Sequence, residues 1–186
     1  MVRYGREPED SSKTCKARGS QLRVHFKKMH EVGAFIRGMK LDEAIQYLEQ
    51  VLRFERAIPF KHFRSGGGRH SQAKIIKAPG DQVGWPIKAV TFVLDLCKNL
   101  KANAVAKNLN VDKLVIRHVQ ANAAIKMRRR TYRAHGRINA FMCNPSHFEL
   151  YAEEEKEKVA KEAPVKVVSR KMAAIQRRTV KVGGGQ

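Results

Sequence analysis

The chain has 186 residues, of which 42% are apolar, a formal net charge of +21 at pH 7 and a pI near 10.4. This length supports one compact core with extensions, and the charge predicts a polyanionic partner because the isolated chain repels itself. An anionic membrane is disfavoured as that partner, since the sequence has no run of about 18 apolar residues and its basic residues are not confined to one amphipathic helix.

The beginning of the chain and its cysteines indicate a reducing compartment. The first ten residues are polar and charged and lack the apolar core of a signal peptide. Cys15, Cys97 and Cys143 lie far apart in the sequence, so neighbouring cysteines supply neither a zinc ligand pair nor a disulfide framework. We therefore expect no metal and no other cofactor.

The first half of the chain predicts a short strand followed by two helices. Residues 20–24 have a strand pattern, and apolar residues then recur at helical spacing up to Gly38, where glycine suits the position after a helix end. The clearest helix covers residues 41–52, because it combines an apolar stripe with Asp42 and Glu43 in its first turn, near the positive end of the helix dipole. That stripe must be buried against another element.

Between residues 57 and 84 the periodicity disappears into prolines and glycines. A bare connection of this length is unusual, so we interpret it as a loop insertion that a partner orders. Residues 65–70 could be mistaken for a nucleotide cradle, but they lack the G-x-x-x-x-G-K-S/T spacing and follow no clear strand. A flexible RNA-contacting insertion is favoured.

A third helix is predicted from Trp85–Pro86 to about residue 108, because proline suits the first helical position and the apolar surface is wide enough for a central, buried helix. Trp85 offers two interpretations. It could form a platform for stacking a nucleic-acid base, but at a helix start facing an apolar stripe it is favoured as a core residue.

The second half of the chain predicts a long β-hairpin. Residues 113–127 alternate with the period of a strand, residues 138–151 form a second extended run, and residues 126–137 make the turn. No Asp or Glu occurs between Lys113 and Phe148. Because a two-stranded ribbon is at best marginally stable alone in water, its support must come from a partner. The tail that follows predicts a helix at residues 153–161 and otherwise partner-dependent order.

The segment from Lys126 to Arg137 is the strongest functional signal, because it places several guanidinium groups and an aromatic ring on a projecting tip. Arginine pairs bidentately with phosphate and stacks on bases. Gly136 permits a backbone conformation or a close approach that a Cβ would block. A solvated charge run or a nuclear-localisation stretch is the alternative interpretation.

The titratable residues do not form a catalytic pattern. The seven histidines show no H-E-x-x-H motif and no His/Cys cluster, and such a spread is more typical of surface positions or RNA contacts. No acidic pair sits beside a glycine-rich strand end. The sequence therefore predicts that the protein is not an enzyme. A nuclease would reveal itself by divalent-dependent turnover, and a DNA-architectural protein by a preference for duplex DNA.

Several motifs between about residues 16 and 151 share the spacing of one protein family. They are Leu22-Arg-Val24 before a helix that ends Ile36-Arg37-Gly38, the helix that opens Leu41-Asp-Glu-Ala-Ile45, the long third helix, and a hairpin tip in which Arg128 is followed by Arg133-Ala134-x-Gly136-Arg137 and then by His147. In these motifs the chain resembles the universal large-subunit ribosomal protein family numbered twenty-two in bacteria and seventeen in the older eukaryotic naming. Its insertion and tail resemble the eukaryotic or archaeal form, the tail favours eukaryotes, and Phe148 replaces the usual aliphatic residue.

Together with the predicted elements, this resemblance implies an α+β fold, with three helices packed on a small antiparallel sheet, a long protruding β-hairpin and an extended basic tail. It implies an N-terminal extension at residues 1–15, a globular domain at 16–153 and a C-terminal extension at 154–186. Within the globular domain, the insertion loop covers about residues 54–83 and the hairpin about residues 113–151.

The resemblance also implies a function. The protein would be a structural constituent of the large ribosomal subunit that binds large-subunit rRNA, lines the nascent-peptide exit tunnel with its hairpin tip, and supports translation and subunit assembly. Its partners would be rRNA, neighbouring large-subunit proteins and the nascent polypeptide, with no membrane and no homo-oligomer. It would act in the cytoplasm, and in the nucleus or nucleolus during assembly.

The residues predicted to meet RNA are mostly cations of the body, the insertion and the hairpin. They are Arg18, Arg23, Lys27, Lys28, His62, Arg64, Arg69, His70, Lys74, Arg117, Lys126, Arg128, Arg129, Arg130, Tyr132, Arg133, His135 and Arg137. The residues that the resemblance assigns to the tunnel wall are Arg128, Arg129, Arg130, Thr131, Tyr132, Arg133, Ala134, His135 and Gly136.

Overall fold

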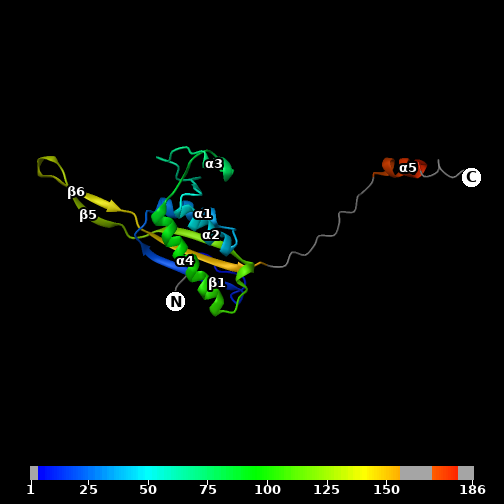
Figure 1. Cartoon of the computed structure of the whole chain (residues 1–186), viewed down its shortest axis with the longest axis horizontal. Coiled ribbons are helices and arrows are strands. Elements are labelled where there is room, and N and C mark those ends of the chain that lie inside the picture. The colour runs from blue at the N-terminus through cyan, green and yellow to red at the C-terminus, as the bar shows by residue number, and fades with distance from the viewer. Residues whose placement is uncertain (1–3, 156–168, 180–186) are drawn as a thin grey trace, which may run out of the picture. The chain divides into compact units, whose positions relative to one another are not determined.

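The computed structural model describes residues 4–155 and 169–179 of the chain, which divides into two compact units at residues 1–155 and 156–186 (Figure 1). In the first unit, helices pack on antiparallel strands, so the predicted α+β class is confirmed. Its elements are β1 (Thr14–Leu22), α1 (Phe26–Ile36), α2 (Leu41–Leu52), β2 (Ile58–Pro59), α3 (Gln72–Ile75), β3 (Val83–Gly84), α4 (Ile87–Ala106), η1 (Val111–Lys113), β4 (Leu114–Ala123), β5 (Met127–Tyr132), η2 (Ala134–Gly136), β6 (Ile138–Cys143) and β7 (Ser146–Glu154).

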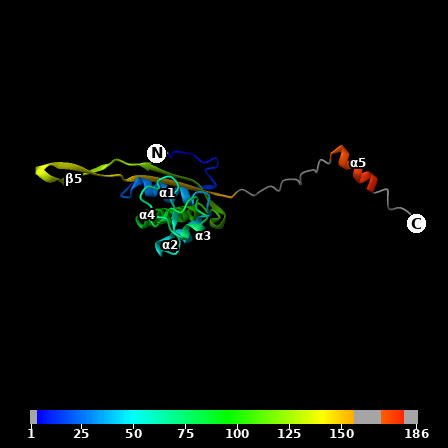
Figure 2. The same cartoon turned by 90° about the horizontal axis from the view of Figure 1, so that it is seen from above.

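The central sheet has the strand order β1-β7-β4, and both pairings are antiparallel. Helices α1, α2 and α4 lie on one face of this sheet, as Figure 2 shows. Gly38 ends α1 in a left-handed conformation with φ +88°, and its N–H donates to the carbonyl of Ile116 at 2.8 Å. Glycine suits this place because a Cβ would strain the left-handed backbone. The hydrogen bond fixes the end of α1 to β4.

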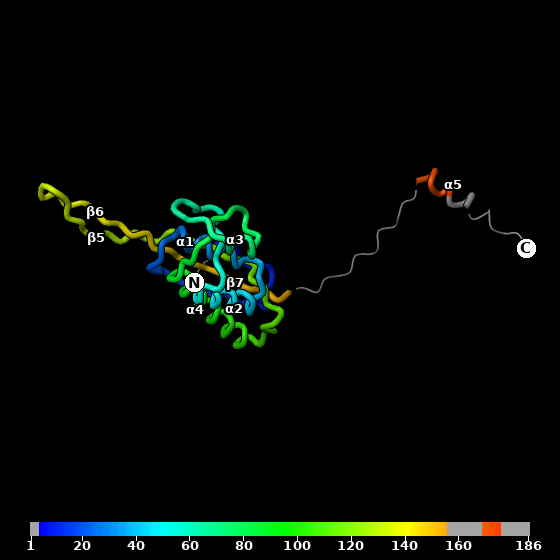
Figure 3. Tube along the Cα trace, turned by 45° about the horizontal axis from the view of Figure 1, so that its top comes forward, coloured from blue at the N-terminus to red at the C-terminus, as the bar shows by residue number. Residues whose placement is uncertain are grey.

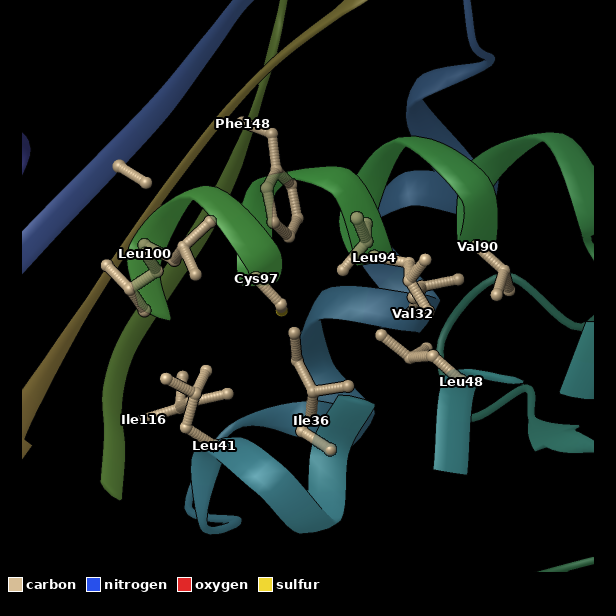
Figure 4. Close-up of a cluster of buried hydrophobic side chains, with 14 of the residues drawn as sticks. Val32, Ile36, Leu41, Leu48, Val90, Leu94, Cys97, Leu100, Ile116 and Phe148 are labelled. Atoms are coloured by element: carbon tan, nitrogen blue, oxygen red, sulfur yellow. The ribbon is translucent and has the colours of Figure 1, made fainter. Parts of the chain in front are cut away.

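The core lies between these helices and the sheet (Figure 4). Ile36 of α1 and Leu48 of α2 are fully buried, and α4 contributes Val90, Leu94 and Leu100 to the same cluster. Burying one large aliphatic side chain stabilises the fold by about 1.5–3 kcal/mol. These contacts hold the body together without any residue from β5 or β6 among the cluster's described members.

Phe148 is fully buried at the point where α1 crosses the sheet. A Cβ placed on Gly33 of α1 would lie 2.9 Å from a ring carbon of Phe148 and 2.9 Å from Cγ1 of Val119. No real side chain fits at that distance, so glycine at position 33 leaves the space that the ring occupies. This pairing explains how the body accommodates an aromatic residue at position 148.

The first strand begins earlier than the sequence predicts. β1 starts at Thr14 rather than at residue 20, and it pairs with β7 from Thr14 opposite Glu153 to Leu22 opposite Ser146. The prediction was wrong because the inward-facing residues include Cys15, Ala17 and Gly19, which are too small to give a strong hydrophobic alternation. Pairing with β7 fixes this segment as a strand.

The β4 strand contains an irregularity that the alternation pattern does not show. Its register against β7 shifts between Ile116 and His118, which leaves Arg117 as the extra residue of a β-bulge. Ile116 faces the core before the bulge, and Val119 packs against the core after it, so the inward-facing set changes parity at this point.

The hairpin arm leaves the body beyond Ala123, where β4 ends (Figure 3). β5 and β6 pair antiparallel from Met127 opposite Cys143 to Tyr132 opposite Ile138. The predicted turn at residues 126–137 was therefore too long, because most of it forms β5. The actual turn covers residues 133–137, where the N–H of Arg133 donates to the carbonyl of Arg137 at 2.8 Å. Pairing with the apolar strand β6 outweighs the weak strand preference of the arginines.

The insertion, which was interpreted as a loop that a partner orders, has local structure of its own within the chain. β2 pairs antiparallel with β3, α3 forms a single turn, and Ala57, Ala73 and Val83 form a small second apolar cluster. Trp85 packs against both this cluster and the main core. The favoured interpretation of Trp85 as a packing residue therefore holds, although its ring is half-buried.

The tail differs from its prediction in the part that the structure describes. Glu153 and Glu154 belong to β7, so they do not begin a helix, and the rest of the predicted helix at 153–161 lies outside the described residues apart from Glu155. The second unit contains a helix that the sequence reading did not predict, α5 (Arg170–Thr179).

Candidate nucleic-acid interface

Every residue predicted to bind RNA has an exposed side chain. The structure brings most of them together on the hairpin arm and on the insertion with its neighbouring α1. Two of them stand apart, since Arg18 lies on β1 and Arg117 on β4, and these are the opposite edge strands of the central sheet. Of the residues assigned to the tunnel wall, Arg128 to Tyr132 lie along β5, and the remaining residues form the turn.

The two faces of the hairpin arm differ in chemistry. Directly opposed residues of an antiparallel pair share a face, so Arg128 and Arg130 lie with Met142 and Ala140 on one side. Arg129 lies opposite Phe141 on the other side, with its guanidinium carbon 5.3 Å from the ring centroid. One face thus carries two cations among mostly apolar side chains, and the other carries a cation–aromatic pair.

The arginines of the arm lack acidic partners within residues 4–155 and 169–179, because none of the salt bridges there involves them. The lysine salt bridges join α2 to α4 instead, with Lys98 3.7 Å from Glu49 and Lys101 2.7 Å from Asp42. The positive charge of the arm is therefore available to an external anion, whereas part of the positive charge of α4 is already neutralised.

A buried carboxylate fastens the insertion to α1. Glu31 is only 2% exposed, and its side chain accepts hydrogen bonds from the N–H groups of Lys61 at 2.7 Å, His62 at 3.1 Å and Phe63 at 2.8 Å. Burial alone would raise the pKa of Glu31, but these three hydrogen bonds, together with His30, outweigh it and lower that pKa. The carboxylate stays charged at neutral pH and holds the backbone of residues 61–63 in place.

This attachment creates a small groove of about 280 Å³ between α1 and the insertion. Lys27 stands over the ring of Phe63 at 5.6 Å, and His30 and His62 lie edge to face or tilted against the same group of rings. Cations and aromatic faces side by side suit contacts with both phosphates and bases. The lining residues are His25, Lys27, Lys28, Glu31, Phe60, Phe63, Ser65, Gly66 and Gly67.

Sequence reasoning missed Phe63 as a member of this surface. Its only local signal was its place between Lys61, His62 and Arg64, where an aromatic residue interrupts a run of cations. His118 was misjudged as a surface or RNA-contacting residue. It is buried on the other face of the sheet, with Nε2 3.3 Å from Oε1 of Glu149 and its ring stacked on Tyr151 at 5.0 Å.

The described residues give little support to metal binding, a reactive cysteine or a membrane-spanning helix. No group of three or more His, Cys, Asp or Glu residues among them is placed to hold a metal ion. Burial raises the pKa of the Cys97 thiol to about 12, so this cysteine stays protonated and unreactive at neutral pH. A search of the same residues found no helix that is both long enough and apolar enough to cross a membrane.

A small α+β body with an acid-free basic arm and a second cation–aromatic surface defines a basic protein with two candidate surfaces for a polyanion. Residues 17–153 match the model of the family described as Ribosomal protein L22p/L17e. The chain therefore belongs to this family of ribosomal proteins. The prediction of a non-enzymatic protein of the large ribosomal subunit, in its eukaryotic form, is confirmed at this level by the relatives described next.

Three relatives from distant eukaryotes are similar over most of the chain. The large ribosomal subunit protein uL22 of Suberites domuncula is 47% identical over 189 residues, which cover 100% of this chain and 99% of that protein. The large ribosomal subunit protein uL22A of Schizosaccharomyces pombe is 50% identical over 161 residues, covering 87% of this chain and 85% of the relative. The uL22 protein of Zea mays is 48% identical over 171 residues, with coverage of 92% and 99%.

Proposed function

We propose that this protein binds large-subunit rRNA through its hairpin arm and through the groove between α1 and the insertion, and thereby supports subunit assembly and translation. The observation that carries the proposal is the arm itself, in which arginines without acidic partners line a two-stranded ribbon of a ribosomal protein family member. Phosphate contacts supply most of the affinity, and an extended arm recognises RNA shape rather than a short sequence.

The proposed partners follow from this RNA-binding role. The rRNA neutralises the charge of +21, and neighbouring large-subunit proteins pack around the same rRNA. The protein acts in cytoplasmic ribosomes and meets its rRNA in the nucleolus during assembly. The turn at residues 133–137 is the farthest part of the arm from the core and has the exposed side chains of His135 and Arg133. The family resemblance supports the proposal that this turn lines the exit tunnel and meets the nascent polypeptide.

RNA binding is tested by competition. We expect the full chain to bind a large-subunit rRNA fragment with an affinity that falls steeply with salt, because each neutralised phosphate releases counterions. Duplex DNA of equal charge should compete poorly. Binding measured by filter retention that persists undiminished at about 0.5 M salt would contradict the proposal, as would equal competition by duplex DNA, which would favour a DNA-architectural protein.

The tunnel assignment is tested by photo-cross-linking in stalled ribosome–nascent-chain complexes. The variant His135→p-benzoylphenylalanine places the reactive group in the turn of the arm, and Lys98→p-benzoylphenylalanine places it on the exposed side of α4 as a matched control. We expect the turn to cross-link to the nascent polypeptide and the α4 position to cross-link only to rRNA or to other proteins. If nascent chain is captured at neither position, or only from α4, the turn does not line the tunnel.

A further inference from the structure

A groove of about 580 Å³ lies at the base of the hairpin arm, where the arm meets the body. Its body wall comes from the segment that joins β1 to α1 and from the first turn of α4, and its arm wall from the body-proximal ends of β5 and β6. This volume is within the range of sites that hold small molecules. The lining residues are Arg23, Val24, His25, Lys88, Met127, Arg129, Phe141, Met142, Cys143, Asn144 and Pro145.

The arm wall of this groove is an apolar platform with a cation over it. Phe141 is 53% exposed although it is a large aromatic residue, and the partly exposed Met127 lies on the same face of the β5–β6 ladder. Arg129 lies directly across the ladder from Phe141 and stands over its ring at 5.3 Å. The exposed ring of Phe141 lies in an open groove beside the guanidinium of Arg129. This combination suits a flat aromatic group that carries negative charge nearby.

The charge of the groove selects among possible occupants. Arg23, Lys88 and Arg129 line it, and no Asp or Glu is among its lining residues. A protein segment placed there would have to be acidic and apolar at once. A nucleotide satisfies both requirements, because its base covers the apolar platform and its phosphate meets the cations.

We propose that this groove holds one unstacked nucleotide of RNA, with its base against Phe141 and Met127 and its phosphate held by Arg23, Lys88 and Arg129. This proposal rests on the proposed RNA-binding function and specifies one site within it. Because the groove is walled by both body and arm, the bound nucleotide joins the two. A bulge or single-stranded position supplies such a nucleotide, since its base is free to leave the stack.

The test uses the full chain and two RNA probes that differ in one feature. One is an RNA stem with a single bulged 2-aminopurine, and the other is the same stem with that base paired. We expect tighter binding of the bulged stem, with quenching of 2-aminopurine fluorescence as the base stacks on the ring. Phe141→Leu should remove the quenching and weaken binding of the bulged stem by about fivefold or more, and Phe141→Tyr should retain both.

The control is Phe54→Leu, because Phe54 is 54% exposed, nearly equal to Phe141, and lies in the insertion. It should leave quenching and affinity unchanged.

The nucleotide site would be overturned if the wild-type chain bound the two stems with equal affinity and without quenching. Salt-dependent RNA binding would remain intact in that case. The same outcome is expected if a protein segment fills the groove. Quenching that survives in a folded Phe141→Leu chain would overturn the assignment to this groove. Failure to bind either stem would instead contradict the proposed function.

Discussion

Replacing Arg128 and Arg130 with glutamine will weaken binding of the full chain to large-subunit rRNA by about a hundredfold at physiological salt. Both side chains lie on the same face of β5, and neither has a carboxylate partner in the described parts of the chain. Hydrogen bonds to charged groups contribute about 1.5–3 kcal/mol each, so two lost phosphate contacts account for this change. The slope of log affinity against log salt should fall by about two, as measured by titrations at several salt concentrations.

The matched control is the double substitution Lys98→Gln and Lys101→Gln. It removes the same net charge, but from two lysines of α4 that already face Glu49 and Asp42 across the α2–α4 interface. We expect less than about a threefold loss of affinity, because these charges are already neutralised in the free protein. Equal losses in the two double variants would show that net charge, and not the placement of arginines on the arm, determines binding.

The substitution Glu31→Gln will release residues 61–63 from α1 without unfolding the body. The glutamine side chain has one acceptor oxygen for three N–H donors, and its own amide hydrogens face those donors. The opening free energy of this contact should fall by about 2 kcal/mol, which accelerates amide hydrogen exchange there about thirtyfold. Exchange measured by mass spectrometry should stay slow in the core helices α2 and α4.

The pH dependence follows from the lowered pKa of Glu31 in the folded protein. A carboxyl group whose pKa is lower when folded stabilises the fold above its unfolded pKa of about 4.3, and that contribution is lost as pH falls through the lower folded value. The wild-type contact should therefore be intact at neutral pH and open only in acid. Glu31→Gln should be open throughout.

Glu49→Gln is the control variant for the hydrogen-exchange and pH measurements on Glu31→Gln. Glu49 is partly exposed and pairs with Lys98 on the surface, where a salt bridge contributes about 0–1 kcal/mol. Protection at residues 61–63 should be unchanged in this variant. If Glu31→Gln behaved in the same way, the insertion would be held by its apolar cluster and not by the buried carboxylate.

The parts of the fold that could be predicted from sequence are those with a strong repeating pattern. The helix at residues 41–52 was predicted with the bounds that the structure has, because its apolar stripe and acidic first turn agree. The β-bulge at Arg117 and the early start of β1 at Thr14 could not be predicted in the same way. Both depend on pairing with β7, which is distant in the sequence.

The residues of the candidate site also divide into those that the local sequence reveals and those that depend on contacts distant in the sequence. The cations of residues 126–137 were evident from composition and spacing, since local charge needs no tertiary information. Phe141 was missed because its importance comes from lying opposite Arg129 across the β5–β6 ladder. Glu31 was missed for a similar reason, since its three hydrogen-bond donors are about 30 residues away in the sequence.

The position of the arm outside the hydrophobic core has a consequence for how such a protein changes during evolution. None of residues 127–143 is a described member of that core. Substitutions there therefore have little effect on the folding of the body, and the proposed RNA contacts of the arm are what restrict them. The sequence at the far end of the arm can therefore diverge between lineages, whereas close packing constrains Phe148, Gly33 and their neighbours.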